Sequence, residues 1–187
     1  APQIAAVELL NVIRPTIAVS VYVVFVAHAL EVNPACRERL SSEPLYAEAF
    51  AQEVRRYYPF FPAVAARVRH DFAWRGYRFE ADCRVMLDLF GTNRDPRAWD
   101  RQNEFLPQRF LGAAPDAYSF IPQGGGTHEH GHRCPGERVA VEIMKLSAAT
   151  LAQRISYEIP PQDLSIDWAR LPALPRSRLV LRGVRLR

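Results

Sequence analysis

A loop at residues 120–137 constrains the fold of this chain of 187 residues more than any other feature. It reads FIPQGGGTHEHGHRCPGE and contains a single cysteine, Cys134. Pro135 suits the first position of a helix, where no backbone N–H is needed, and apolar residues then recur at helical spacing over 139–151. The pattern predicts a final helix over 135–153 with Cys134 at its N-terminus.

A thiol at the N-terminus of a helix is held as the thiolate by the helix dipole and by free backbone N–H groups. A thiolate is a good ligand for a soft metal or for a haem iron. Gly124, Gly125, Gly126 and Gly131 would let the loop lie flat against a large planar ligand, because glycine carries no side chain. We expect Phe120 to cover one face of that ligand.

The loop resembles the cysteine-ligand loop of the cytochrome P-450 superfamily. That loop has a Phe, a Gly, a basic residue two positions before the cysteine and a Gly two positions after it, here Phe120, Gly126, His132 and Gly136. The extra Gly-Gly-Thr-His-Glu-His segment resembles the fatty-acid peroxygenase branch. The resemblance implies haem b as the cofactor, with Cys134 as the axial ligand of the iron. It also implies a mainly α fold with small β-sheets, as in the C-terminal part of the cytochrome P-450 fold.

Two further segments match the signatures of this superfamily. Glu53 and Arg56 form a Glu-x-x-Arg pair in a helix predicted over 44–58, and Arg109 belongs to a Phe-x-Pro-x-Arg-Phe segment. The resemblance implies that Glu53, Arg56 and Arg109 form a buried structural network. This network would shape the irregular meander at 97–119 beneath the haem, without taking part in catalysis.

A long apolar stretch over 4–32 predicts a central helix that is buried through a core, because apolar residues occupy nearly all its sides. Arg14 and Pro15 interrupt it, and no acid precedes Thr16. An arginine among apolar neighbours needs an anionic partner, and a proline removes a helical hydrogen bond. One interpretation is that Arg14 pairs with a carboxylate elsewhere in the fold while Pro15 separates two helices. The other is that the pair marks a catalytic site.

The segment Asn-Val-Ile-Arg-Pro resembles the peroxygenase branch, where Arg and Pro lie above the haem. The resemblance implies that Arg14, beside Pro15, binds the carboxylate of a long-chain fatty acid through two parallel hydrogen bonds. That carboxylate would carry protons for hydrogen peroxide as general acid and base, and Cys134 would favour O–O cleavage. The implied activity is peroxide-dependent hydroxylation at the α or β carbon, or decarboxylation to terminal alkenes, without a redox partner.

The segment between the second and third signatures implies further pocket residues. In the superfamily it lines the pocket and supplies a basic residue to a haem propionate, so Arg67 and His132 are candidates for that contact. Phe61 and Val64 are candidates for contact with the substrate, although they fit an ordinary core equally well.

Two other classes of function stay open at this point. The first is a conventional cytochrome P-450 monooxygenase fed by a ferredoxin or a flavin reductase. The second is a non-enzymatic module that binds zinc or copper through His128, His130, His132 and Cys134, which alternate with other residues.

Composition favours a soluble globular chain with one domain, because 49% of residues are hydrophobic and 24% are charged. The net charge of +4 comes from scattered arginines, and Lys145 is the only lysine, so no nucleic-acid partner is expected. Cys36, Cys83 and Cys134 are odd in number and widely spaced, which favours a reducing, cytoplasmic compartment. The longest apolar run, 16–27, is too short for a transmembrane segment.

The remaining pattern predicts short strands. Residues 78–90 read as one or two strands, and the C-terminal strands occupy 154–187, with a hairpin turn at Arg182 and Gly183. We expect residues 1–187 to form a single partial domain, the C-terminal part of a longer haem-thiolate enzyme.

Overall fold

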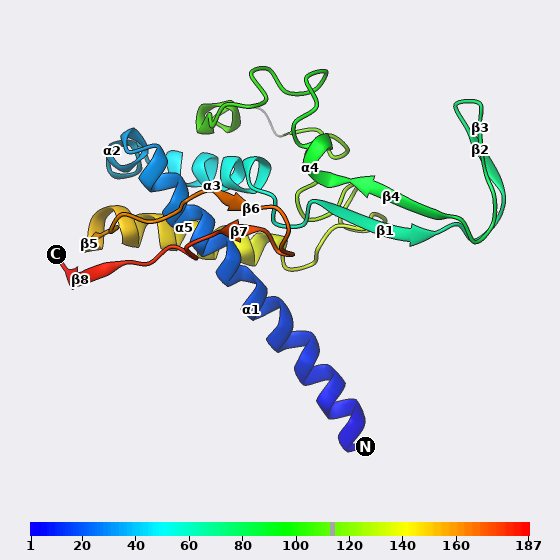
Figure 1. Ribbon diagram of the computed structural model, residues 1–187, viewed down its shortest axis with the longest axis horizontal. Coiled ribbons are helices and arrows are strands. Elements are labelled where there is room, and N and C mark those ends of the chain that lie inside the picture. The colour runs from blue at the N-terminus through cyan, green and yellow to red at the C-terminus, as the bar shows by residue number, and fades with distance from the viewer. Residues whose placement is uncertain (113–114) are drawn as a thin grey trace.

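The structure is a computed structural model that describes residues 1–112 and 115–187. Long helices form its body, and the strands of the described residues pair in four small antiparallel sheets of two strands each (Figure 1). The prediction of a mainly helical fold with small sheets is confirmed.

Helix α1, Pro2–Val32, is continuous through Pro15. Its two halves differ in burial: every residue before Ala18 is exposed, whereas the buried side chains begin at Tyr22. The buried residues are Tyr22, Phe25, Val26, Ala27, His28, Ala29 and Leu30. Figure 1 shows the N-terminal half running out from the body of the molecule. The expectation of a helix buried along its whole length is therefore wrong for the first half, because none of the other described elements covers that half.

Helix α1 is also long and apolar enough to cross a membrane, by length and composition alone, and most of its apolar stretch is not buried. The expectation of no transmembrane segment rested on the uncharged run 16–27 alone, and the helix as a whole passes the test that this run fails. Length and composition of this kind are shared by core helices, signal sequences and membrane spans.

Two helices follow α1. Helix α2, Ala35–Ser42, is absent from the sequence prediction, and helix α3, Tyr46–Tyr57, corresponds to the helix predicted over 44–58. Helix α2 buries only Cys36 and Leu40, and its many charged residues make this apolar pattern hard to detect in the sequence. Helix α3 is strongly amphipathic, so its inner face packs on α1 and on the helix that follows the cysteine loop.

Strands β1, Ala63–Arg67, and β4, Arg84–Asp88, pair as an antiparallel ladder. Between them, β2, Phe72–Trp74, and β3, Tyr77–Phe79, form a hairpin that projects far from the body (Figure 1). The sequence predicted only the second half of this arrangement, over 78–90. Strands β1 and β2 lack a clear alternation of buried and exposed residues, so the period-two signal is weak there.

A short helix, α4, Leu89–Thr92, ends this region, and its N-terminus is capped by the Asp88 side chain, which accepts from the N–H of Gly91. The chain then enters the predicted meander, 97–119, which is irregular apart from the 3-10 turn Pro107–Phe110. Residues 113–114 of that meander lie outside the described part of the chain.

The predicted final helix, 135–153, corresponds to α5, Glu137–Ala149, with a π-helical turn, Thr150–Arg154, at its end. Strand β5, Ile155–Glu158, then pairs antiparallel with β8, Arg182–Leu186.

The hairpin turn expected at Arg182 and Gly183 is wrong, because both residues lie inside strand β8. Gly183 has φ +59°, and the register shifts between Ser156 and Glu158, so the glycine accommodates an irregularity in the ladder. A second small sheet, β6, Ile166–Asp167, with β7, Leu174–Pro175, was not predicted.

The core lies where the C-terminal half of α1 packs between α3 and α5. Phe25, Phe50 and Met144 are fully buried there, one from each helix. Each such side chain contributes roughly 1.5–3 kcal/mol by leaving water. This packing sets the positions of α3 and α5, and the cysteine loop joins α5 at its N-terminus.

Candidate functional site

Cys134 lies just before helix α5, separated from its first residue, Glu137, by Pro135 and Gly136, and is partly exposed. Its backbone N–H donates to the carbonyl of Gln123 at 2.9 Å, and its own carbonyl accepts from the N–H of Glu137 at 3.1 Å. A Cβ on Gly136 would lie 3.8 Å from the cysteine Sγ, so the glycine leaves ordinary contact space beside the sulfur. Cys134 is thus partly exposed and close to the start of a helix, as a ligand thiolate requires.

A hollow of about 440 Å³ opens beside the cysteine loop. Loop residues form one side of it, and Leu87 of β4 and Tyr118 of the meander complete it. Its lining residues are Leu87, Tyr118, Ile121, Gly125, Gly126, Thr127, His130, Gly131 and His132. Gly126 and His132, both expected to contact the cofactor, thus lie on its wall.

The structure gives two of the loop glycines a role other than the expected one, which was to let the loop lie flat against a planar ligand. A Cβ on Gly124, where φ is +99°, would lie 1.9 Å from the carbonyl oxygen of His132, and a Cβ on Gly131 would lie 2.5 Å from that of Thr127. The close approach at these two positions is therefore between the loop and itself. Gly126 has φ +83° and a less crowded surrounding, with Gly131 Cα at 3.3 Å.

The ladder of β1 and β4 separates two pocket residues. Val64 pairs with Leu87, which lines the hollow, whereas Arg67 pairs with Arg84. Because side chains alternate along a strand, Val64 and Arg67 point to opposite faces. Of the two candidates for a propionate contact, His132 lies at the hollow and Arg67 does not share its face. Phe61 precedes this ladder and is 43% exposed.

Phe120 is 2% exposed and packs against Trp99, Phe110 and the guanidinium of Arg55. This corrects the expectation that its ring covers one face of a planar ligand, because its faces are taken by protein. The ring instead supports the start of the cysteine loop from beneath.

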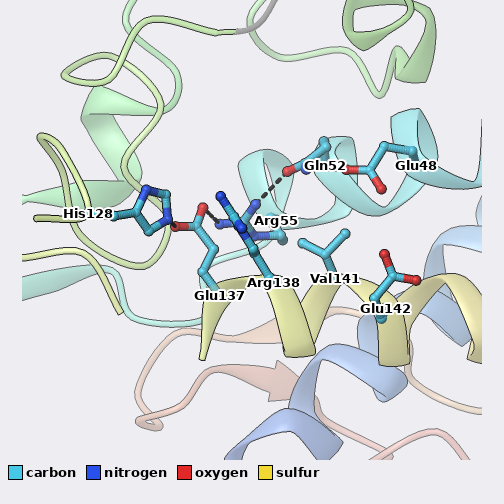
Figure 2. A pocket seen from close by; sticks show the side chains of 8 residues that line it. All are labelled: Glu48, Gln52, Arg55, His128, Glu137, Arg138, Val141 and Glu142. Carbon is cyan, nitrogen blue, oxygen red and sulfur yellow. Dashed lines mark hydrogen bonds and ion pairs between the residues drawn. The ribbon is translucent and has the colours of Figure 1, made fainter. Parts of the chain in front are cut away.

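Three charged residues at the loop were missed by the sequence analysis: Arg55, Arg133 and Glu137. Arg133 forms a bidentate pair with Glu137 at 2.9 and 2.7 Å, and Arg55 donates to the same carboxylate (Figure 2 shows Arg55 and Glu137). Burial opposes ionisation of Glu137, but the hydrogen bonds of Arg133 and the charge of Arg55 outweigh it and lower the pKa of this carboxyl. The only sequence signal was the spacing of Arg133 and Glu137, four apart at the start of a helix.

The structure brings Glu53, Arg56 and Arg109 together. Glu53 and Arg56 are fully buried and form a bidentate pair with both distances 2.7 Å, and Arg109 approaches Glu53 at 3.3 Å. Arg56 also donates to the carbonyls of Asn93, Gln102 and Glu104. Helix α3 is thereby tied to several points of the meander.

Arg14 and Pro15 lie on the exposed half of α1. Within the described ranges, no hydrogen bond or ion pair engages the Arg14 side chain, so the structure offers it no carboxylate partner. The Thr16 hydroxyl donates to the Val12 carbonyl at 2.8 Å and is satisfied within the helix.

The histidines of the loop do not converge. His128 Nε2 lies 3.4 Å from Glu137, whereas His130 and His132 line the hollow. Across the residues that the structure describes, no group of three or more His, Cys, Asp or Glu side chains is placed to hold a metal ion. The geometry therefore gives the metal-module alternative no support.

The donor set and its surroundings fit a haem. A single accessible thiol at a helix N-terminus faces a glycine, and a hollow with an apolar wall adjoins the loop. A planar apolar group with one iron needs such a ligand and such a wall, and Cys134 would hold it.

This combination of helices, small sheets and a cysteine loop is that of the cytochrome P450 family. The model of the family described as "Cytochrome P450" matches residues 35–175, and the chain belongs to that family.

Among solved structures, the chain is similar to cytochrome P450SP alpha in complex with (R)-ibuprophen, with 53% identity and a TM-score of 0.93, over 100% of this chain and 46% of the other. It is also similar to cytochrome P450EX alpha with myristic acid, with 42% identity and a TM-score of 0.92, over 100% and 46%. A cytochrome P450 OleT variant in complex with arachidonic acid follows, at 41% identity and a TM-score of 0.89, over 97% and 43%.

Curated relatives are more distant. "Cytochrome P450 71A8" of Mentha piperita is 28% identical over 140 residues, which cover 72% of this chain and 27% of that protein. "Psoralen synthase" of Pastinaca sativa is 31% identical over 120 residues, covering 62% and 24%. The chain thus spans about a quarter of these relatives and less than half of the solved structures.

Proposed function

We propose that this chain is part of a haem-thiolate peroxygenase that uses hydrogen peroxide to hydroxylate long-chain fatty acids at the α or β carbon, or to decarboxylate them to terminal alkenes. One observation carries the proposal: Arg14 is a cation on α1 with no carboxylate partner among the described residues, directly before Pro15 and with no acid beside Thr16. Two similar structures contain fatty acids, myristic acid in one and arachidonic acid in the other, which supports a fatty acid as the missing anion.

Arg14 would bind the carboxylate of the fatty acid. Its planar guanidinium matches a carboxylate in two parallel hydrogen bonds, and an unpaired arginine among apolar neighbours such as Ile13 and Ile17 gains most from such a partner. The bound carboxylate would accept a proton from hydrogen peroxide and return it to the leaving oxygen, as general base and then general acid. The substrate thus supplies the acid that the helix lacks.

Cys134 would hold haem b, which supplies the oxidising chemistry when bound. The chain positions that sulfur through the bonds of the Cys134 backbone to Gln123 and Glu137. Val64 and Phe61 would contact the alkyl chain, and His132 on the wall of the hollow would contact a propionate. We propose a cytoplasmic enzyme that takes its oxidant from peroxide and needs no reductase.

The test compares Arg14→Gln with wild type in the full-length protein. We expect peroxide-driven turnover of myristic acid to fall by about 100-fold or more, because the carboxylate loses its orientation, while the haem spectrum is unchanged. Wild type should bind myristic acid and fail to bind the alcohol of the same length. Arg138→Gln, an exposed arginine without a contact to Arg14, is the control.

Normal turnover by Arg14→Gln would overturn the carboxylate clamp. Turnover that requires NAD(P)H with a ferredoxin or flavin reductase, and does not respond to peroxide, would instead establish the conventional monooxygenase.

A further inference from the structure

We propose that Arg55 is a positioning residue for the cysteine ligand, and that it clamps both ends of the loop that carries Cys134. Its guanidinium donates from three nitrogens to three different side chains (Figure 2 shows two of them, Gln52 and Glu137). Nε donates to Gln123 Oε1 at 2.9 Å, Nη2 donates to Glu137, and Nη1 donates to Gln52 of its own helix. Gln123 lies near the start of the loop at 120–137, and Glu137 is its last residue.

Both outer partners of Arg55 are one hydrogen bond from the Cys134 backbone. The Gln123 carbonyl accepts the Cys134 N–H at 2.9 Å, and the Glu137 N–H donates to the Cys134 carbonyl at 3.1 Å. Arg55 therefore ties to helix α3 the two residues, Gln123 and Glu137, whose backbones are hydrogen-bonded to the ligand cysteine. A displacement of the Arg55 guanidinium would therefore move Gln123 and Glu137 together, and with them the backbone of Cys134.

The charges at this point do not balance within the protein. Arg55 and Arg133 carry two positive charges and Glu137 one negative charge, which leaves an excess of one positive charge. All three side chains are largely buried, with exposed fractions of 1%, 13% and 8%. Excess charge inside a protein is costly unless it is paired, which favours keeping both arginines bound to Glu137.

The shape of Arg55 matters as well as its charge. A guanidinium offers a rigid fork that can reach three acceptors, whereas an ammonium is a point charge on a flexible stem. The ring of Phe120 lies 5.1 Å from the Arg55 Cζ and stabilises the cation further. Lysine could keep the charge at this position but not the clamp.

The inference rests on the thiolate ligation of haem that the family implies, and not on the fatty acid or the peroxide. Its experiment therefore uses no turnover. The readouts are the hydrogen exchange of the loop and the reduction potential of the iron in the full-length, haem-loaded protein.

The first comparison sets Arg55→Met against Arg138→Met. Arg138 is the next residue after Glu137, lies on the same pocket wall and is exposed, so it controls for the loss of charge. We expect Arg55→Met to raise amide exchange over 123–137 by about tenfold, with no change in the buried half of α1. The control should leave the loop unchanged.

The second comparison separates charge from shape. Loss of the buried Arg55 cation from the cysteine loop favours the ferric state, so Arg55→Met should raise the ferric-to-ferrous ratio at a fixed applied potential by about threefold or more. Arg55→Lys should restore most of that ratio while its loop exchange stays raised. A general loss of stability would give neither pattern.

Loop exchange and potential that match wild type in Arg55→Met would overturn the proposal, and so would a rise in exchange throughout the protein. If Arg55→Met does not fold, Gln123→Met removes a single acceptor of the clamp. It should raise exchange in the same loop by a smaller factor, about threefold, and no rise would count against the clamp.

Discussion

The adjacent residues Arg55 and Arg56 on helix α3 bind different parts of the protein. Arg56 pairs with Glu53 and donates to three carbonyls of the following chain, whereas Arg55 reaches the cysteine loop. Successive residues of a helix point about 100° apart, so neighbours in sequence face different elements. One side of α3 therefore holds the meander and another holds the loop of Cys134.

Substitution Glu53→Gln should severely destabilise the fold. It leaves Arg56 and Arg109 without their anion in a fully buried place, which costs about 3–5 kcal/mol of unfolding free energy. Urea unfolding followed by circular dichroism measures the loss, and haem retention should fall with it. Glu43→Gln is the matched control, because Glu43 pairs with Arg39 at a largely exposed site, where an ion pair contributes little to stability. Equal stability of both variants would contradict the network.

Tyr22 is a different case, because its buried hydroxyl makes no hydrogen bond of good geometry among the described residues, although the Arg55 guanidinium lies close to it. Its ring stacks on Phe60 at 4.2 Å, and burial raises the pKa of the phenol. Tyr22→Phe keeps the ring and removes the unsatisfied group, so the unfolding free energy should stay equal or rise by up to about 1 kcal/mol. A loss above about 1 kcal/mol in urea unfolding would show that the hydroxyl has a partner in solution.

At the scale of elements, His28 joins the C-terminal half of α1 to two other segments. Its Nε2 faces the carbonyl of Leu164 at 3.0 Å and must donate, while Nδ1 lies 2.7 Å from the Tyr58 hydroxyl and accepts from it in the neutral ring. Burial favours that neutral form in the folded state. Burial is the main cause that lowers its pKa, opposed by the Leu164 carbonyl and by Glu31.

This arrangement predicts a stability that depends on pH. The unfolded state binds the His28 proton more readily, so its stabilising contribution is complete above a pH of about 6.5 and is lost as the pH falls below it. The slope attributable to one group is at most about 1.4 kcal/mol per pH unit. Urea unfolding of wild type and His28→Gln over the acid range measures it.

His28→Gln can donate to Leu164 and accept from Tyr58 without titrating. The other histidines are unchanged in this variant, so only the slope that belongs to His28 should disappear. Identical slopes in the two proteins would show that His28 does not titrate between the states.

Helix α1 shows how one element can have two environments. Its composition is apolar along its length, but only its C-terminal half meets α3 and α5. The pattern of side chains predicted the helix and could not predict where its partners end. The sequence pattern did not predict strands β1, β2, β6 and β7 for a related reason. Their two-stranded sheets bury neither face fully, so buried and exposed residues do not alternate clearly.

At the scale of the whole molecule, the exposed half of α1 leaves large apolar side chains in water. Ile4, Leu10 and Ile17 are each more than 60% exposed. Apolar surface of this extent favours association, so the chain of 187 residues should self-associate in solution.

Replacing Ile4, Leu10 and Ile17 with Gln should reduce that association and keep the helix content, because none of the three contributes to the buried core. Light scattering after size exclusion measures the association, and far-ultraviolet circular dichroism measures the helix. A loss of helix content would show that these side chains are packed in solution.

Much of the site could be predicted from short spacings. The position of Cys134 at a helix N-terminus follows from the Pro135 and Gly136 that precede an amphipathic run, and Glu53 and Arg56 share a helix face at three residues apart. The sequence could not predict to which face of the β1–β4 ladder Arg67 points, or that Phe120 is buried. Strand register and ring packing depend on partners far away in the sequence.

The sequence by itself determined the main helices, the cysteine ligand and the family resemblance, because each depends on residues close together in the chain. The tertiary structure alone decided that α1 is half buried, that Val64 and Arg67 oppose each other, and that Arg55 braces Gln123 and Glu137. Arg55 lies 68 residues from Gln123 and 82 from Glu137. Contacts over such separations are set by the packing of α3 against α5, which local periodicity does not contain.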